Sequence, residues 1–384
     1  MKCKLSDICD FRKGKVEVEN LNTKNYISTE NMLPNKSGIT EATSLPNVSS
    51  TQEYKNGDVL VSNIRPYFKK IWQARYDGGC SNDVLVFVPK STTDRDFLYY
   101  LLADDDFFTY SMATSKGTKM PRGDKTSIMQ YEVPMLDFCT QKKIASVLKS
   151  LDEKIELNNA INENLEQQLA ALFSHIFADD ISKASINTCP MLGDLINVID
   201  NRGKTPPLTT DTIEYPIIDV GALKGAGRIV DFNNCTKYVN KATYETWFRS
   251  GHPKSLDILL STVGSLAELK IYLGTRGCIA QNVVALRATS ISPLYLYQYL
   301  RFIRADLVAY NIGSVQPSIK VTHIIKHPIF VPETSILETF EETAKAITEQ
   351  LYANYNENES LKELRDALLP KLMSGEIDIS KFQL

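Results

Sequence analysis

The sequence predicts an α+β protein in which two similar mixed α/β domains are separated by two long helices that form an antiparallel coiled coil. Three observations predict this architecture: a heptad seam in mid-chain, a second seam near the C-terminus, and matching motifs ahead of each seam. Together they indicate an internal pseudo-twofold repeat in the order domain, helix, domain, helix. The expected segments are residues 1–140, 141–178, 179–334 and 335–384.

The first helix is predicted from Gln141 to Phe177 by an unbroken seam. Steps of four and three residues alternate along it, which keeps one stripe of the helix facing a partner helix. At about 1.5 Å per residue the helix would be about 55 Å long, and we expect Asp179 and Asp180 to end it. The seam positions are Ile144, Leu148, Leu151, Ile155, Asn158, Asn162, Leu165, Leu169, Leu172 and Ile176.

The second helix is predicted from Ser335 to about Leu372 and repeats the first at an offset of 196 residues. Asn354 and Asn358 occupy the places of Asn158 and Asn162, and antiparallel pairing sets Asn158 opposite Asn358 and Asn162 opposite Asn354. A buried Asn in a seam costs stability but penalises slipped registers. The alternative is that these amides are solvated at the edge of the seam. The second seam comprises Phe340, Ala344, Ile347, Leu351, Asn354, Asn358, Leu361, Arg365, Leu368 and Leu372.

The two domains carry the same motifs in the same order. Strands are predicted at Val59–Ser62, Ser81–Pro89 and Tyr131–Pro134, and single helices at Phe97–Tyr110 and Leu294–Tyr310. The matching pairs are Leu5-Ser6-Asp7 with Leu192-Gly193-Asp194, Gly14-Lys15 with Gly203-Lys204, Asp58–Ser62 with Asp257–Ser261, Gly79-Cys80 with Gly277-Cys278, and Gly117-Thr118 and Pro121 with Gly313-Ser314 and Pro317.

Composition places the chain among ordinary globular proteins, with 43% hydrophobic and 23% charged residues. No apolar run is long enough to span a membrane, and the seven cysteines form no CxxC pair, so we expect a reduced, cytoplasmic setting. The net charge of −3 argues against a nucleic-acid binder. However, residues 181–334 carry 16 basic and 11 acidic side chains, and local charge decides whether a surface can meet phosphates. The acidic side chains lie mainly in the two helices. The alternative explanation for them is that Glu is a good helix former.

No pattern typical of an enzyme or a metal site is present. The sequence lacks a Walker loop, a GxGxxG motif, an HExxH motif and an Asn/Asp-Pro-Pro-Tyr segment. The four histidines do not pair with cysteines at metal-ligand spacing. Cys80 and Cys278 lie at equivalent positions beside strands and are expected to be small buried hydrophobes rather than nucleophiles. We therefore expect no catalytic residues and no metal.

In this order the motifs resemble the specificity (S) subunit of Type I restriction–modification systems over nearly all 384 residues. The segments that carry the resemblance are the helix QKKIASVLKSLDEKIELNNAINENLE, the stretch LRDALLPKLMSGEI at Leu364–Ile377, the RGKTPP opening of the second domain, and the two DxLxS segments.

The resemblance implies two target recognition domains, each reading one half of a bipartite sequence in double-stranded DNA. It also implies helices that act as a spacer and as a docking surface for two methyltransferase subunits, with a restriction/translocase subunit in the larger assembly. The chain would hold no cofactor; S-adenosylmethionine is expected on the methyltransferases and ATP on the restriction subunit. No membrane and no homo-oligomer are required.

Two other functions stay open at this point. One is a structural adaptor that bridges two proteins through the coiled coil. The other is a detached recognition portion of a fused restriction–methylation enzyme. Salt-dependent binding to one bipartite duplex would favour the specificity subunit over the adaptor.

Candidate DNA-contacting residues are cations and amides in Gly- and Pro-containing loops, where side chains can reach phosphates or a groove edge. The alternatives are solvated surface loops and, for Tyr67 and Phe68, core positions. The equivalent loops differ, Lys119-Met120-Pro121-Arg122 against Val315-Gln316-Pro317-Ser318, which suggests that the two half-sites differ. The candidates are Arg65, Lys69, Lys70, Lys116, Lys119, Arg122 and Lys125 in the first domain, and Arg202, Lys204, Lys224, Arg228, Arg276, Gln316, Ser318 and Lys320 in the second.

Overall fold

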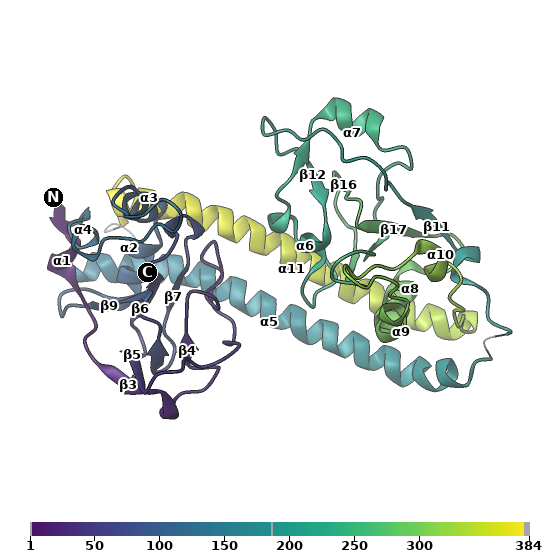
Figure 1. The fold of residues 1–384 in the computed structure, drawn as a ribbon, viewed down its shortest axis with the longest axis horizontal. Coiled ribbons are helices and arrows are strands. Elements are labelled where there is room, and N and C mark those ends of the chain that lie inside the picture. Colours follow the sequence, from purple (N-terminus) through teal and green to yellow (C-terminus); the bar gives the residue numbers. More distant parts are fainter. Residues whose placement is uncertain (1, 186, 380–384) are drawn as a thin grey trace. The chain divides into compact units, whose positions relative to one another are not determined.

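The computed structural model describes residues 2–185 and 187–379. It divides into two compact units (Figure 1): unit 1 comprises Met1–Ile155 with Glu359–Leu384, and unit 2 comprises Glu156–Asn358. Each unit therefore contains one α/β domain together with part of both long helices. Within the described part of the chain, no helix has an apolar stretch of the length that a bilayer crossing demands.

Unit 1 is built on a four-stranded antiparallel sheet in the order β2-β9-β6-β7. The central strand β6 is buried on both faces because Val59 and Val61 pack in the cluster that holds the helices, whereas Leu60 packs in the cluster beneath the second sheet. This two-sided burial explains why the strand reads as a continuous apolar run. The strands are β2 (Cys9–Phe11), β6 (Val59–Ser62), β7 (Ile71–Gln73) and β9 (Val84–Pro89).

A second sheet of unit 1 has the order β3-β5-β8-β4. Its pair β4 and β8 is parallel, with Ile27 opposite Cys80. Close to the N-terminus, β1 (Lys2–Lys4) pairs with β10 (Glu132–Pro134). The strands of the second sheet are β3 (Lys15–Glu17), β4 (Tyr26–Ile27), β5 (Ser50–Tyr54) and β8 (Gly78–Cys80). The short helices of the unit are α1 (Leu5–Ile8), α2 (Arg95–Ala103), α3 (Asp105–Ala113) and α4 (Lys125–Ile128), with 3-10 turns η1 (Val18–Asn20) and η2 (Pro66–Phe68).

Unit 2 repeats this plan. Its main sheet has the order β11-β17-β14-β15, and its second sheet, β13-β12-β16, again contains a parallel pair, with Ile217 opposite Cys278. On the central strand β14, Ile258 and Leu260 face the helices and Leu259 faces the other cluster. The strands are β11 (Ile196–Ile199), β12 (Tyr215–Ile218), β13 (Tyr238–Val239), β14 (Ile258–Ser261), β15 (Leu269–Ile271), β16 (Cys278–Ile279) and β17 (Val283–Ala288). The helices are α6 (Val220–Leu223), α7 (Lys241–Trp247), α8 (Pro293–Phe302), α9 (Arg304–Ala309) and α10 (Val321–Ile324), with η3 (Leu192–Asp194) and η4 (Phe232–Asn234).

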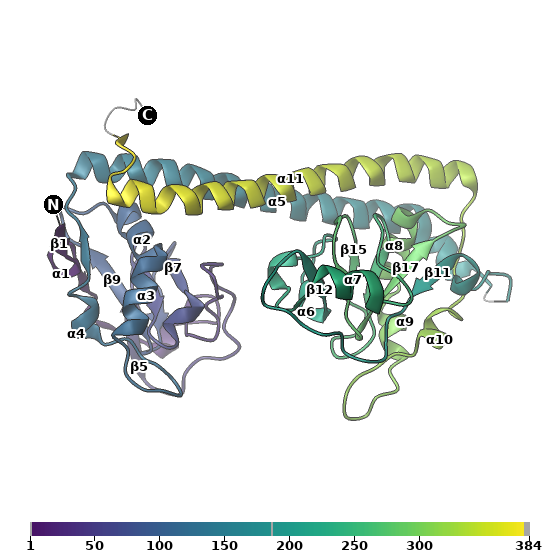
Figure 2. The ribbon, with the colours of Figure 1, turned by 90° about the horizontal axis from the view of Figure 1, so that it is seen from above.

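The long helices are α5 (Phe138–Lys183) and α11 (Thr334–Ser374). Within each unit they run antiparallel and side by side (Figure 2). All twenty predicted seam positions are buried or half-buried, as a coiled-coil stripe requires. The expectation that Asp179 and Asp180 end the first helix was wrong, because α5 continues to Lys183, whose ammonium lies 3.6 Å from the Asp179 carboxylate one turn earlier.

The four seam asparagines form a hydrogen-bonded layer inside unit 2. The Asn158 side chain donates to Oδ1 of Asn358 at 2.9 Å, and the Asn354 side chain donates to Oδ1 of Asn162 at 2.7 Å. Asn158 is 1% exposed, so the solvated-edge alternative does not hold for it. The amides satisfy one another, which a slip of either helix would undo.

Two predicted helices are each divided in the structure. Phe97–Tyr110 falls into α2 and α3 because Asp104 adopts an extended conformation between them and its carboxylate caps α3 at the backbone N–H of Asp106. Leu294–Tyr310 is likewise split between α8 and α9 at Ile303. Periodicity spans such breaks because the apolar face continues through them.

Candidate nucleic-acid interface

The candidate interface of unit 1 is formed by two loops that lie against each other. One is the α3–α4 connection, residues 114–124, and the other is the β6–β7 connection, residues 63–70. The backbone N–H of Arg65 donates to the carbonyl of Pro121 at 2.8 Å, and that of Gly123 donates to Asn63 at 3.1 Å. These bonds fix the Gly/Pro loop at the end of a central, buried strand.

Unit 2 builds the same pair of loops. The backbone N–H of Gly264 donates to the carbonyl of Pro317 at 3.0 Å, and that of Ile319 donates to Thr262 at 2.8 Å. Val263 forms an isolated antiparallel bridge with Ser318, as Ile64 does with Arg122 in unit 1. The predicted repeat therefore extends to the hydrogen bonds of the candidate loops.

The unit 1 loop carries exposed cations at its ends and its tip. Lys116 forms an ion pair with Asp124, and this hydrogen bond holds the pKa of Asp124 at about 2. Arg122 lies 3.2 Å from the carboxylate of Asp83, and Lys119 is exposed at the tip. Exposed ion pairs contribute little stability, so these cations can exchange their carboxylate partners for phosphates at small cost.

The neighbouring loop of unit 1 adds aromatic rings and further cations. Tyr67 is 49% and Phe68 38% exposed, and their ring centroids lie 4.6 Å apart, so these rings are not core. Arg65 and Lys69, on either side, have left-handed backbone conformations with φ near 50°. Within the part of the chain that the structure describes, the buried Nε of Arg65 has no hydrogen-bond partner.

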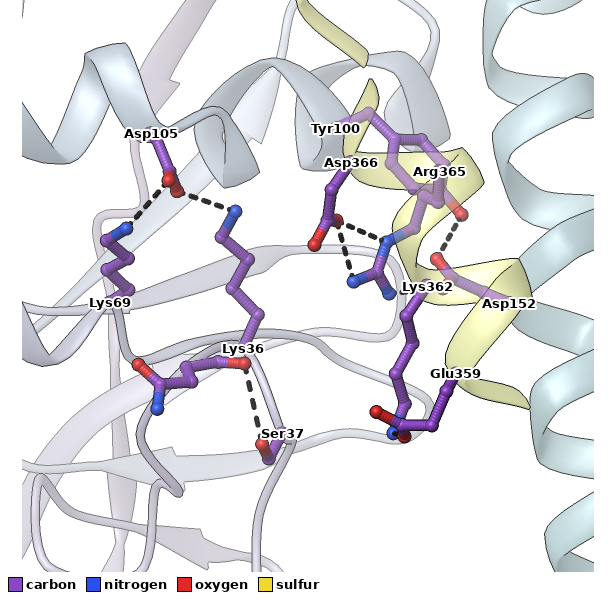
Figure 3. A network of polar contacts seen from close by, with 11 residues as sticks. Lys36, Ser37, Lys69, Tyr100, Asp105, Asp152, Glu359, Lys362, Arg365 and Asp366 are labelled. Carbon is purple, nitrogen blue, oxygen red and sulfur yellow. Dashed lines mark hydrogen bonds and ion pairs between the residues drawn. The ribbon is translucent and has the colours of Figure 1, made fainter. Parts of the chain in front are cut away.

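Two lysines of this loop already have partners. Lys69 lies 2.7 Å and Lys36 2.8 Å from the carboxylate of Asp105 (Figure 3). Burial raises the pKa of Asp105, but the hydrogen bonds from these two lysines outweigh the effect of burial. The pKa of Asp105 therefore lies below its usual value. Lys70 donates to the carbonyl of Thr29 at 2.6 Å, and burial lowers the pKa of its ammonium. Lys125 is exposed with its Nζ 5.9 Å from the ring centroid of Phe11.

In unit 2 the predicted contacts are spread over several loops. Gln316 and Lys320 are exposed and Ser318 half-buried in the loop between α9 and α10, which projects from the unit in Figure 2. Lys204 and Lys224 are also exposed. Two further candidates form ion pairs within the unit. Arg202 pairs with Asp200, and Arg276 pairs with Glu214 beside the ring of Tyr215.

Arg228 was wrongly predicted to contact DNA. Its side chain is 0% exposed and forms a buried ion pair with Glu166 of α5 at 2.9 Å. Glu166 also accepts from Arg301 at 2.7 Å, and Arg228 donates to the hydroxyl of Thr348 on α11. Burial raises the pKa of Glu166, but the hydrogen bonds from Arg228 outweigh the effect of burial. The pKa lies below its usual value, so the carboxylate stays ionised. The cluster ties the α/β domain of unit 2 to both long helices.

Unit 1 has its own polar link between domain and helices, also missed by sequence reasoning (Figure 3). Asp152 on α5 accepts from the hydroxyl of Tyr100 on α2 at 2.7 Å and from Arg365 on α11 at 2.7 Å. Burial and the neighbouring Asp152 raise the pKa of Tyr100, which keeps the phenol a donor. Arg365 could have been found, because it is the one charged residue of the two predicted seams.

The two cysteines at equivalent positions of the repeat are buried. Cys80 and Cys278 are fully buried, and burial raises the pKa of each thiol to about 12, so neither is a nucleophile at neutral pH. Among the described residues, no group of three or more His, Cys, Asp or Glu side chains is placed to hold a metal ion.

Comparison with known proteins shows what the chain is similar to. The chain is 26% identical over 443 aligned positions to the HindI specificity subunit of Haemophilus influenzae, covering 92% of this chain and 94% of that one. It is 24% identical to the MjaIX specificity subunit of Methanocaldococcus jannaschii, covering 77% and 72%. Residues 1–167 match the Type I restriction modification DNA specificity domain. These findings support the expected resemblance to the specificity subunits of Type I restriction–modification systems.

A solved structure agrees at the level of the fold. The S subunit of a Type I restriction–modification system from M. genitalium superposes with a TM-score of 0.54 at 17% identity, covering 97% of this chain and 96% of that chain. The predicted fold class, two similar mixed α/β domains with an antiparallel helix pair, is confirmed. These likenesses agree with the expectation of a non-catalytic DNA-recognition subunit.

Proposed function

We propose that this chain reads DNA, and that each α/β domain recognises one half of a bipartite, asymmetric target. The observation that carries the proposal is the repeated pair of loops, which present different side chains on the same hydrogen-bonded backbone. Two similar scaffolds with different tips are what recognition of two different half-sites requires. The contacting residues would be the predicted candidates without Arg228.

The two long helices would set the distance between the half-sites and dock two methyltransferase subunits. The 46 residues of α5 make a helix about 69 Å long, which corresponds to about 20 base pairs at about 3.4 Å each, so the two domains would meet half-sites separated by an unread spacer. In the complete assembly, S-adenosylmethionine would be bound by the methyltransferases and ATP by a restriction subunit. Such a complex works on chromosomal DNA, so we place it in the cytoplasm.

Methylome sequencing of cells with and without this gene tests the proposal directly. The expected result is one bipartite motif that loses its methylation when the gene is deleted. Binding of the purified chain to that duplex should weaken steeply with salt, because phosphate contacts release counterions. Equal affinity for unrelated duplexes, together with an unchanged methylome, would contradict the proposal.

An adaptor function without DNA reading is the second candidate. Leu157 and Ile161 lie one turn apart on α5 and are 55% and 39% exposed, so the helix offers an apolar strip to a partner. Substitution of both by Lys separates the two functions. The change should weaken the partner contact in either case, but only a specificity subunit would bind one target duplex selectively, both before and after the change.

A further inference from the structure

The loops 116–122 and 312–318, which we call the reading loops, are closed by equivalent backbone hydrogen bonds. Lys116 and Arg122 exchange backbone hydrogen bonds of 2.9 Å, and Ile312 donates to Ser318 at the same distance, at an offset of 196 residues. Each loop has Gly second and Pro sixth. Gly117 has a φ of 92°, and a Cβ on Gly313 would lie 1.8 Å from the carbonyl oxygen of Gln316, so neither glycine accepts a side chain.

The tips of the reading loops differ sharply in chemistry. Lys119 and Met120 stand in unit 1 where Val315 and Gln316 stand in unit 2. Met120 is 48% exposed and Val315 is 98% exposed, so Val315 packs against almost nothing in its own chain. Folding therefore does not account for an apolar residue there. The side chain of Val315 is free to contact a ligand outside the chain.

Base edges in the major groove match these side chains. Gln pairs with adenine at N6 and N7, Lys pairs with guanine at O6 and N7, and apolar side chains contact the 5-methyl group of thymine. Val315 and Gln316 are adjacent, so one tip can meet both the adenine and a thymine methyl within one or two A·T pairs. Lys119 favours guanine at the equivalent place in the other half-site, with Met120 beside it.

We propose that the reading loops are equivalent base-reading elements, and that residues 119–120 and 315–316 set base preference at corresponding positions of the two half-sites. Val315 and Gln316 read an A·T step with a thymine methyl; Lys119 and Met120 read a guanine. This inference rests on the proposed function and deepens it. It adds Met120 and Val315 to the contact residues and predicts bases.

Selection from random duplexes by the full-length chain tests the assignment. Replacement of the unit 2 tip by alanine (Val315→Ala with Gln316→Ala) should flatten the preference at an A·T position of one half-site and leave the other half-site unchanged. The exchange Lys119→Val with Met120→Gln should convert the guanine of the other half-site to A·T. Ile213→Ala is the matched control, because Ile213 is 78% exposed elsewhere in unit 2.

Removal of one methyl group from the DNA gives a second readout. Deoxyuridine in place of the selected thymidine should weaken wild-type binding several-fold and weaken Val315→Ala much less, because the smaller alanine has less apolar surface to place against the methyl group. If wild type selects a bipartite motif that both tip variants retain, the inference is wrong and the proposed function stands. If wild type selects no sequence at all, the proposed function fails and the inference falls with it.

Discussion

Single buried charges decide how each domain is attached to the helices. Glu166 lies on α5 outside the predicted seam, yet it is only 6% exposed and accepts hydrogen bonds from Arg228 and Arg301. A helical pattern shows which residues share a face but not which loop will cover that face. For this reason the sequence predicted a DNA contact at Arg228, which lies between Gly227 and Ile229 in a loop rich in glycine.

Replacement of Glu166 by Gln should destabilise unit 2 strongly. The substitution leaves the buried guanidinium of Arg228 and the half-buried guanidinium of Arg301 without a counter-charge, and breaking a buried pair typically costs about 3–5 kcal/mol. Thermal unfolding of Glu166→Gln should show a fall of several degrees in Tm, and the double variant Glu166→Leu with Arg228→Met should recover part of it. Lys224→Ala, an exposed change in the same loop, should leave Tm unaltered. A Tm for Glu166→Gln equal to that of wild type would show that the pair does not hold the domain.

The buried Lys270 should make the stability of the fold rise with pH in the alkaline range. It is 3% exposed, it donates to the backbone carbonyls of Gly225 and Gly227, and burial lowers the pKa of its ammonium to about 8. Between pH 8 and the unfolded pKa near 10.5, the unfolded chain holds a proton that the folded chain has lost, so stability rises with pH in this window.

We expect unfolding measured from pH 7.5 to 10.5 to show wild type gaining up to about 3 kcal/mol relative to Lys270→Met. The methionine variant supplies the baseline because it removes only this titration. A difference between the two proteins that stays constant with pH would mean that Lys270 remains charged in the folded state throughout.

At the level of elements, the sequence predicted features that depend on neighbouring residues or on the internal repeat. Other contacts between distant segments were not predicted. The seams, the central strands and the antiparallel asparagine pairs followed from periodicity, because each depends on residues close in sequence or on the repeat itself. The strand pair β1–β10 and the breaks at Asp104 and Ile303 did not. The strand β10 was predicted within Tyr131–Pro134, but the three residues of its partner β1 carry too little pattern to identify. A cap inside an apolar stretch does not interrupt its period.

The asparagine layer should trade stability for a fixed register. Changing Asn158, Asn162, Asn354 and Asn358 to Leu removes polar groups from the seam and should raise Tm, while spin labels on Gln168 and Glu349 should show a broader distance distribution. Asn164→Leu is the control, because Asn164 is exposed on the same helix. A sharp loss of stability in the fourfold variant would show that the layer is mainly a stabilising network.

At the scale of the whole molecule, the duplication is what made the fold predictable from one sequence. Each weak motif in one half was supported by its counterpart in the other, down to Gly79-Cys80 and Gly277-Cys278, whose cysteines lie opposite Ile27 of β4 and Ile217 of β12 in parallel strand pairs. The candidate site was less predictable, because exposure is a property of the assembled chain. Val315 and Met120 are apolar and were passed over, although exposure singles them out.

The proposed spacing function makes a prediction that involves the entire chain. Insertion of seven residues into α5 and seven into α11 at matching heptads preserves both seams and lengthens each helix by about 10.5 Å. If the helices set the distance between half-sites, the selected motif should keep both half-sites and gain about three base pairs of unread spacer at about 3.4 Å each. The same insertion in α5 alone breaks the pairing of Asn158 with Asn358 and should lower both Tm and affinity for every duplex. An unchanged spacer in the doubly extended protein would show that the helices hold the domains without measuring the DNA between them.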